Sequence, residues 1–303
     1  MKKVVSCIAV VFLIFSCREK IMIQNIGDNH LHTHADLGTP GFPQMPIPTD
    51  NETTEEGIAL GRKLFYDPIL SGDETQSCAS CHQQSRAFSD TKRFSVGING
   101  ISGKLNASAI INPGWQSSAF WNGRANSLEE QALEPVENPI EMHLSWQDAV
   151  VRLKGHDDYP GDFEIAFGTR FITKDLVAKA LAQFERSLIS NQSKFDKFMN
   201  GEIELTPLEL AGYNLFLSEK AECFHCHGRP LFTDDELHNN GLDDNPDNGH
   251  FLVSSYVHDK GKFKTPTLRN IEYTAPYMHD GRFQTLEEVI NFYSDSIKTS
   301  PTV

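Results

Sequence analysis

The sequence predicts a mainly α-helical protein of two domains joined by long loops. Its 303 residues correspond to about two domains of ordinary size. Helix-start signals, a Ser or Thr ahead of acidic residues and then apolar positions at helical spacing, recur along the chain, whereas alternating β-type runs are scarce. Hydrophobic residues at 39% and charged residues at 22% suit a packed core and exclude a disordered chain or a multi-span membrane protein.

The charge balance limits the partners. Asp and Glu number 41 against 27 Lys and Arg, which gives a formal net charge of -14. Nucleic acids attract clustered basic residues, so we expect no nucleic-acid partner. A basic protein partner fits this charge better.

The first 17 residues have the pattern of a signal peptide. Lys2 and Lys3 precede an apolar run over residues 4–15, and Ser16 and Cys17 follow. The run is short for a bilayer span, and its end resembles a bacterial lipobox. We expect a periplasmic protein anchored by a lipid on Cys17, which would be its only membrane contact; cleavage without lipid is the alternative.

The remaining chain divides into a tether and two predicted domains. Residues 18–50 form the expected flexible tether, because Pro40, Pro43, Pro46 and Pro48 favour extended backbone. Residues 51–165 form the first predicted domain and residues 166–303 the second. The boundary falls in the segment 155–168, before a long helical pattern.

Each predicted helix begins at a capping residue. Thr54 precedes acidic residues and the apolar positions of a first helix, and Ser145 with Asp148 precedes another. Thr173 precedes the longest pattern, with apolar residues at i, i+4 and i+8. Capping boxes at residues 206–209, with proline in the first helical position, and at residues 285–288 start two more.

Two C-x-x-C-H motifs carry the chemistry. Residues 78–82 read CASCH and residues 223–227 read CFHCH, and together they use every cysteine except Cys7 and Cys17 of the leader. Composition alone would produce roughly 0.005 such motifs. In this motif the thiols of Cys78 and Cys81, or of Cys223 and Cys226, form thioethers to haem, and the adjacent histidine ligates iron.

Other readings of the four cysteines remain open but fit less well. A Cys₄ zinc site would leave both motif histidines without a role. Local disulfides or a thioredoxin-like dithiol would lack the expected βαβ context. Two covalent haem c groups agree with export, because haem c is assembled outside the cytoplasm.

Around the motifs the chain resembles the bacterial di-haem cytochrome c peroxidases and their MauG-type relatives, from about residue 42 to residue 293. The landmarks are LGRKLFYDP at 60–68, FWNGRA at 120–125, EQA at 130–132, NPIEM at 138–142, TPTLRN at 265–270 and PYMHDGR at 276–282. The resemblance implies two cytochrome c-like domains, each around one covalent haem c. It implies a peroxide-reactive haem on His82 and an electron-entry haem ligated by His227 and Met278.

The resemblance also assigns four supporting residues. Glu141 would be the distal acid/base, a role that a carboxylate can fill when it takes a proton from one peroxide oxygen and returns it to the other. Gln131 would be its hydrogen-bonding neighbour, and Trp121 would lie between the haems and assist electron transfer. Asn106 matches a position that helps bind a calcium ion. Without the resemblance, Glu141 reads as a solvated loop acid and Trp121 and Met278 as core residues.

Three features depart from the family pattern. Ile98 occupies the position where many of these peroxidases place a blocking histidine, and no histidine lies between His82 and His143. We therefore expect the first haem to be open to peroxide in the oxidised protein. MauG-type enzymes place Tyr where this chain has Met278. The chain also stops soon after residue 293, where the family usually continues, so either a truncated C-terminal end or a short variant is expected.

These observations favour a peroxidase that reduces hydrogen peroxide with electrons from a small redox protein, such as a monohaem cytochrome c or a cupredoxin. A MauG-type enzyme that oxidises a protein substrate is the first alternative, and a non-catalytic di-haem electron carrier is the second. The sequence leaves the oligomeric state open, with a homodimer as one option.

Overall fold

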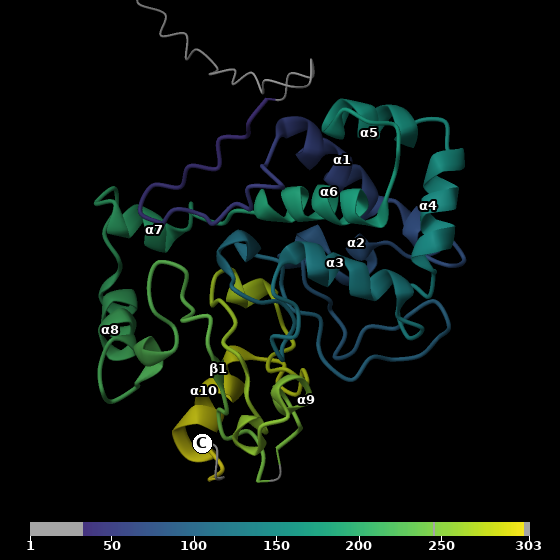
Figure 1. Ribbon diagram of the computed structural model, residues 1–303. Helices are drawn as coiled ribbons and strands as arrows, with labels where there is room; N and C mark the ends of the chain where they lie inside the picture. The colour runs from purple at the N-terminus through teal and green to yellow at the C-terminus, as the bar shows by residue number, and fades with distance from the viewer. Residues whose placement is uncertain (1–32, 245, 300–303) are drawn as a thin grey trace, which may run out of the picture.

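The computed structural model describes residues 33–244 and 246–299 (Figure 1). The fold is mainly helical with long loops, as predicted. The leader at residues 1–17, with Cys17, lies outside the described residues, as do residues 18–32 of the predicted tether. Within the described part of the chain, no helix is long and apolar enough to cross a membrane.

The N-terminal part is a packed group of helices. In chain order they are α1 (Glu55–Tyr66), α2 (Cys78–Cys81), α3 (Leu128–Glu137), α4 (Trp146–Gly155), α5 (Tyr159–Phe167) and α6 (Lys174–Arg186). Helices α1 and α6 lie side by side (Figure 1), and one face of α6 buries Val177, Ala180 and Leu181. Gly61 permits this contact, because a Cβ there would stand 1.9 Å from the Ala180 carbonyl oxygen.

The predicted helix caps are confirmed. The side chain of Thr54 accepts a hydrogen bond from the Gly57 N–H at 3.0 Å, and Ser145 and Thr173 cap α4 and α6 in the same way. Thr206 and Thr285 form the two predicted capping boxes, which start α8 (Pro207–Phe216) and α10 (Leu286–Asp295). These bonds are local, which explains why a short sequence window reveals them.

Helix α6 packs with the N-terminal core. The predicted division at residue 165 places this helix in the second domain. In the structure its apolar face, including Leu181 and Phe184, joins the cluster formed by Leu64 and Phe65 of α1 and by α3. Its packing therefore groups α6 with the helices that precede it.

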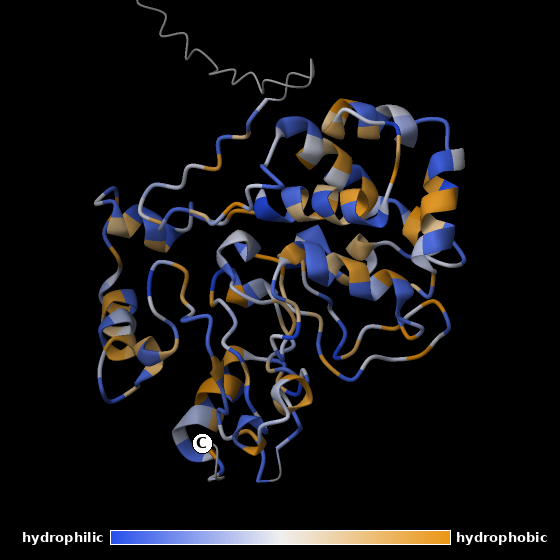
Figure 2. Cartoon of the chain, viewed as in Figure 1, coloured by the Kyte–Doolittle hydropathy of each residue, from blue (hydrophilic) through white to orange (hydrophobic). Residues whose placement is uncertain are grey.

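The C-terminal part contains less regular structure and few buried apolar residues. Its elements are α7 (Lys194–Met199), α8, β1 (Leu237–His238), α9 (Phe251–Ser254), β2 (Phe263–Lys264) and α10. Strands β1 and β2 pair antiparallel, with Leu237 opposite Lys264. The buried hydrophobic residues among those described here are Leu242, Phe263 and Phe292. Hydrophobic turns of α8 are visible in Figure 2, and its Leu208 is 83% exposed.

Among the short hairpins in the described chain, one in each part directly precedes a helix. The first hairpin (residues 119–125) is closed by a bridge between Ala119 and Ala125, and the second hairpin (residues 277–283) by a bridge between Tyr277 and Phe283. Each is followed directly by a capped helix, α3 after the first and α10 after the second. The two parts of the chain therefore contain a repeated unit.

Candidate functional site

The first C-x-x-C-H motif forms a short helix with its histidine at the end. Helix α2 spans Cys78–Cys81, and His82 follows with its Nδ1 3.0 Å from the Phe88 carbonyl oxygen. Burial lowers the pKa of His82, which favours the neutral ring. With the Nδ1–H donated to a carbonyl, Nε2 is the free ligand atom, an arrangement typical of metal-binding histidines.

The second motif repeats this geometry. Cys223–His225 form a 3₁₀ turn, and His227 follows with its Nδ1 3.0 Å from the Phe232 carbonyl oxygen. Burial also lowers the pKa of His227. Both Phe88 and Phe232 have positive φ, at 57° and 55°, and this backbone turns their carbonyl groups toward the histidines.

The thiol groups suit thioether formation better than the alternative sites. All four cysteines are free, so the local disulfides are not observed. Among the described residues, the cysteines also form no four-thiol cluster that could hold zinc. Burial raises the pKa of Cys78 to about 12, with the nearby Glu185 carboxylate adding to the shift. Two thiols and a histidine with one fixed tautomer fit a covalently bound haem at each motif.

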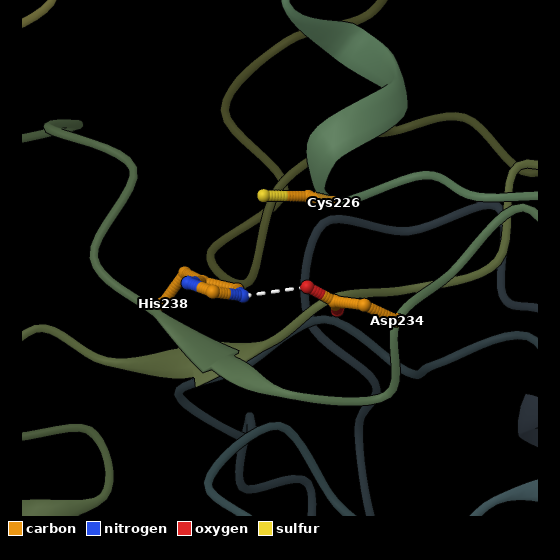
Figure 3. Close-up of side chains that lie close together, drawn as sticks. All are labelled: Cys226, Asp234 and His238. Atoms are coloured by element: carbon orange, nitrogen blue, oxygen red, sulfur yellow. Dashed lines mark hydrogen bonds and ion pairs between the residues drawn. The ribbon is translucent and has the colours of Figure 1, made fainter.

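Cys226 lies in one group that resembles a metal site (Figure 3). The ligand atoms of Cys226, Asp234 and His238 lie within 4.8 Å of one another, and His238 Nε2 is 2.7 Å from an Asp234 oxygen. Burial and then the Asp234 charge raise the pKa of Cys226, which disfavours the thiolate that a metal would need. The thiol belongs to the haem-binding motif, so the group is not a separate metal site.

Glu141 lies within electrostatic reach of the first motif. Its carboxylate accepts a hydrogen bond of 2.6 Å from the Asn138 side chain, and burial raises its pKa against the opposing effects of Asn138 and the Arg124 charge. The Glu141 charge in turn raises the pKa of both Cys78 and Cys81, so the carboxylate is within electrostatic reach of both thiols. A half-buried carboxyl near a haem-attachment helix can exchange a proton with a molecule bound there.

The loop that carries Glu141 packs against the segment where the family has a blocking histidine. The Ile98 N–H donates a 3.0 Å hydrogen bond to the Glu141 carbonyl oxygen. Gly97 makes this contact possible, because a Cβ there would lie 2.2 Å from the Ile140 carbonyl oxygen.

Gln131 lies half-buried on α3, and no hydrogen bond joins its side chain to Glu141 in the described structure.

Trp121 connects the two parts of the chain. Its Nε1–H donates to the Asn106 carbonyl oxygen at 2.8 Å, and its own carbonyl accepts from the Lys264 N–H at 2.7 Å. The ring meets that of His279 edge-on, with centroids 6.4 Å apart, and His279 stacks on Phe263 at 3.7 Å. Trp121 is therefore fixed between segments of the N-terminal and C-terminal parts.

Met278 lies directly before His279 in the second hairpin. Its backbone has a φ of 73°, and the Asn240 amide lies 3.5 Å from its sulfur. A cavity of about 110 Å³ is lined by Phe120 and Trp121 from the first hairpin and by Tyr277 and Met278 from the second. The structure thus brings Trp121 and Met278, predicted as the inter-haem residue and the second iron ligand, to one cavity.

Asn106 is buried, and its side-chain amide donates to the carbonyl oxygens of Lys92 and Arg93, both at 3.2 Å. Its N–H donates to the His279 carbonyl oxygen at 2.8 Å. These bonds place Asn106 at the junction of the two parts. Its role as a calcium ligand stays a prediction.

Comparison with known proteins identifies the family. The family model described as di-haem cytochrome c peroxidase matches residues 55–204. The chain is 34% identical over 297 residues to the cytochrome-c peroxidase IdrP1 of Pseudomonas sp. (strain SCT), covering 86% of this chain and 78% of the relative. The chain belongs to the di-haem cytochrome c peroxidase/MauG family. The match to the methylamine utilization protein MauG of Methylorubrum extorquens is 37% over 263 residues, covering 86% of this chain and 74% of that protein.

Solved structures of the family agree with this assignment. A MauG-like protein associated with microbial copper homeostasis superposes with a TM-score of 0.81 at 38% identity, over 87% of this chain and 84% of that one. The family is di-haem, and the two C-x-x-C-H motifs of this chain support two haem c groups. The named relatives divide between cytochrome c peroxidases and MauG proteins, so membership leaves the specific reaction open.

Two residues near the site were not anticipated from the sequence. Asn138 donates to Glu141, and Arg124 acts on the Glu141 charge while its Nε donates to Glu134 at 2.7 Å. Both lie inside the family landmarks NPIEM and FWNGRA. The landmarks marked the segments, but the effect of the Arg124 charge on Glu141 depends on the fold.

Proposed function

We propose that this protein reduces hydrogen peroxide to water with electrons from a small redox protein. Each turnover consumes one peroxide, two protons and two electrons, and forms two water molecules. Peroxide would react at the site that carries His82, and electrons would enter at the site that carries His227 and Met278. The haem groups, when bound, would supply the iron chemistry at both sites.

The position and the raised pKa of Glu141 carry this proposal. The carboxyl is within electrostatic reach of both thiols of the first motif, and burial brings its pKa nearer to neutral. A group with such a pKa accepts a proton from one peroxide oxygen and donates it to the other more readily than an exposed glutamate does. Gln131 would orient peroxide from α3.

Electron transfer would use the residues at the junction of the two parts. Met278 would be the second ligand of the His227 haem, which raises the reduction potential of such a site and suits it for receiving electrons. Trp121 lies on the same cavity and is held by two hydrogen bonds from opposite parts of the chain. Its fixed aromatic ring would shorten the electron path between the two sites.

The donor, location and calcium site form part of the proposal. The formal charge of -14 favours a basic donor such as a monohaem cytochrome c or a cupredoxin. We place the protein in the periplasm, held by a lipid on Cys17. Asn106 at the junction would contribute to a calcium site.

A MauG-type reaction on a protein substrate is the second candidate. It is favoured by the similarity to MauG and MauG-like proteins, at 37% and 38% identity. The Met278 position argues for the peroxidase, because the family resemblance implies Tyr at this position in MauG-type enzymes. Rapid peroxide turnover with reduced cytochrome supports the first candidate, whereas slow turnover with oxidation of an added protein partner supports the second.

The test is steady-state peroxide reduction by the holoprotein and by two variants. Glu141→Gln keeps the side-chain shape but removes the base, so turnover should fall by roughly 10²-fold or more. Glu204→Gln is the matched control, because Glu204 is exposed and lies in the loop before α8. Full activity in Glu141→Gln, or an equal loss in both variants, would reject the role of Glu141.

A further inference from the structure

The two hairpins have the same backbone conformation at corresponding residues. Phe120 in the first hairpin has a φ of 64°, and Met278 in the second has a φ of 73°. Gly123 and Gly281 follow three residues later with φ values of 67° and 62°. Positive φ is uncommon for Phe and Met. Its recurrence at matched positions shows that the hairpins are the same structural unit.

The surroundings of the hairpins also correspond. The Asn106 N–H donates to the His279 carbonyl at 2.8 Å, and the Lys264 N–H donates to the Trp121 carbonyl at 2.7 Å. In each bond, a residue of one part donates to the residue that follows Phe120 or Met278 in the hairpin of the other part. The same sequence spacing that relates Asn106 to Lys264 also relates Trp121 to His279 and Phe120 to Met278.

Phe120 therefore stands in the first unit where Met278 stands in the second. A methionine presents a thioether sulfur that can ligate iron, whereas a phenyl ring presents no ligand atom. We propose that Phe120 keeps the outer coordination position of the His82 haem open, because it replaces the methionine ligand that the repeated hairpin would otherwise present. This inference rests on the proposed ligand role of Met278.

Phe120 contacts a cation whose charge reaches the acid/base. The Arg124 guanidinium lies 3.3 Å from the centre of the Phe120 ring. The charge of Arg124 also acts on Glu141, and its Nε bonds to Glu134. In the second hairpin, the corresponding Arg282 pairs with Asp243 and Asp280 instead. The Phe120 ring is thus held against a cation whose charge acts on Glu141.

The two sites would therefore differ in coordination because one hairpin carries Phe120 where the other carries Met278. The first site would keep a position for peroxide, whereas the second would be closed by sulfur. The loop at Ile98 also supplies no histidine ligand to the first haem. Neither Phe120 nor Ile98 therefore offers an atom that could occupy the coordination position for peroxide.

The test replaces Phe120 by Met in the full-length holoprotein. Phe120→Met should convert the ferric high-spin signal of the first haem to a low-spin signal and add the absorption band of methionine-ligated haem. Its cyanide affinity should fall by at least about tenfold, because cyanide must displace the sulfur. Phe120→Leu, which offers no ligand atom, is the matched control and should keep the high-spin signal and the cyanide binding.

The reciprocal variant covers a failure of Phe120→Met to fold or to load haem. Met278→Phe should open the second site, so that a second equivalent of cyanide binds. Haem content per chain is measured in every variant. A haem-loaded Phe120→Met protein with an unchanged ferric spectrum and cyanide affinity would overturn the inference, and so would a loaded Met278→Phe protein that binds no additional cyanide.

These outcomes separate the inference from the proposed function. If the wild-type protein lacks peroxide turnover but has an open first haem that Phe120→Met closes, the peroxidase proposal fails and the inference stands. If turnover is rapid but the Phe120→Met spectrum is unchanged, the inference fails and the peroxidase proposal stands.

Discussion

Replacement of Asn138 by Ala should shift the pH dependence of peroxide reduction. The Asn138 amide donates a 2.6 Å hydrogen bond to Glu141 and holds the pKa of that carboxyl below the value that burial alone would give. A hydrogen bond to a charged group contributes about 1.5–3 kcal/mol, and 1.36 kcal/mol corresponds to one pKa unit. Because solvent reaches part of the carboxyl, we take the lower end, a rise of about one unit.

The sign of the effect follows from the role of Glu141 as a base. A higher pKa leaves less carboxylate at any acidic pH, so the acid limb of kcat/KM should move up by about one pH unit while the alkaline plateau changes little. Asn99→Ala is the matched control. The Asn99 side chain holds the same loop through a 3.0 Å hydrogen bond to the Pro139 carbonyl and has no hydrogen bond to Glu141. An unmoved acid limb in Asn138→Ala, or an equal shift in both variants, would refute this reasoning.

Three further predictions concern the core, the Glu141 loop and a buried ion pair of the C-terminal part. Burial raises the pKa of Glu185 to about 8. Between the ordinary pKa of a glutamate and this value, the folded protein keeps a proton that the unfolded chain has lost. The free energy of unfolding therefore falls as the pH rises through this range. Glu185→Gln should remove this pH dependence. In chemical denaturation, the free energy of unfolding of the variant relative to that of wild type should rise by about 2 kcal/mol between about pH 6 and about pH 8. A difference that stays constant with pH would contradict the raised pKa. Gly97→Ala should displace the Glu141 loop and lower peroxide turnover by about tenfold or more, because its Cβ would meet the Ile140 carbonyl at 2.2 Å. Gly103→Ala, whose nearest neighbour would lie at 3.7 Å, should not do so. Arg269→Ala should destabilise the C-terminal part by about 3–5 kcal/mol in thermal denaturation, because Arg269 is 4% exposed and forms a two-pronged pair with Asp196. Lys194→Ala breaks an exposed pair and should leave the midpoint nearly unchanged.

Local features were predictable because neighbouring residues make them. The helix starts at Thr54, Ser145 and Thr173 depend on a hydroxyl and an N–H a few residues away. The C-x-x-C-H motifs place two thiols and a histidine on a single turn of chain. A short window of sequence contains all the atoms involved in each case, so reading that window suffices.

Features that join distant segments were harder to predict from the sequence. The predicted boundary before α6 followed a change of pattern along the chain, but the partners of α6 are α1 and α3, far earlier in the sequence. Two backbone hydrogen bonds, from Asn106 to His279 and from Lys264 to Trp121, join residues far apart in the sequence. No short stretch of sequence predicts them. Such contacts depend on how two separate units dock, and residue patterns within either unit do not specify this.

The sequence by itself determined the helical class, the two haem-binding motifs and, through family landmarks, the residues worth examining. It marked Glu141, Trp121 and Met278 as candidates because they occupy recognisable motifs. Only the tertiary structure decided which neighbours act on them: Asn138 and Arg124 on the carboxyl, and Asn106 and His279 around Trp121. It also showed that Phe120 and Met278 occupy matching backbone positions. The physical reason is that protonation and electrostatics depend on distance in space, which the order of residues does not give.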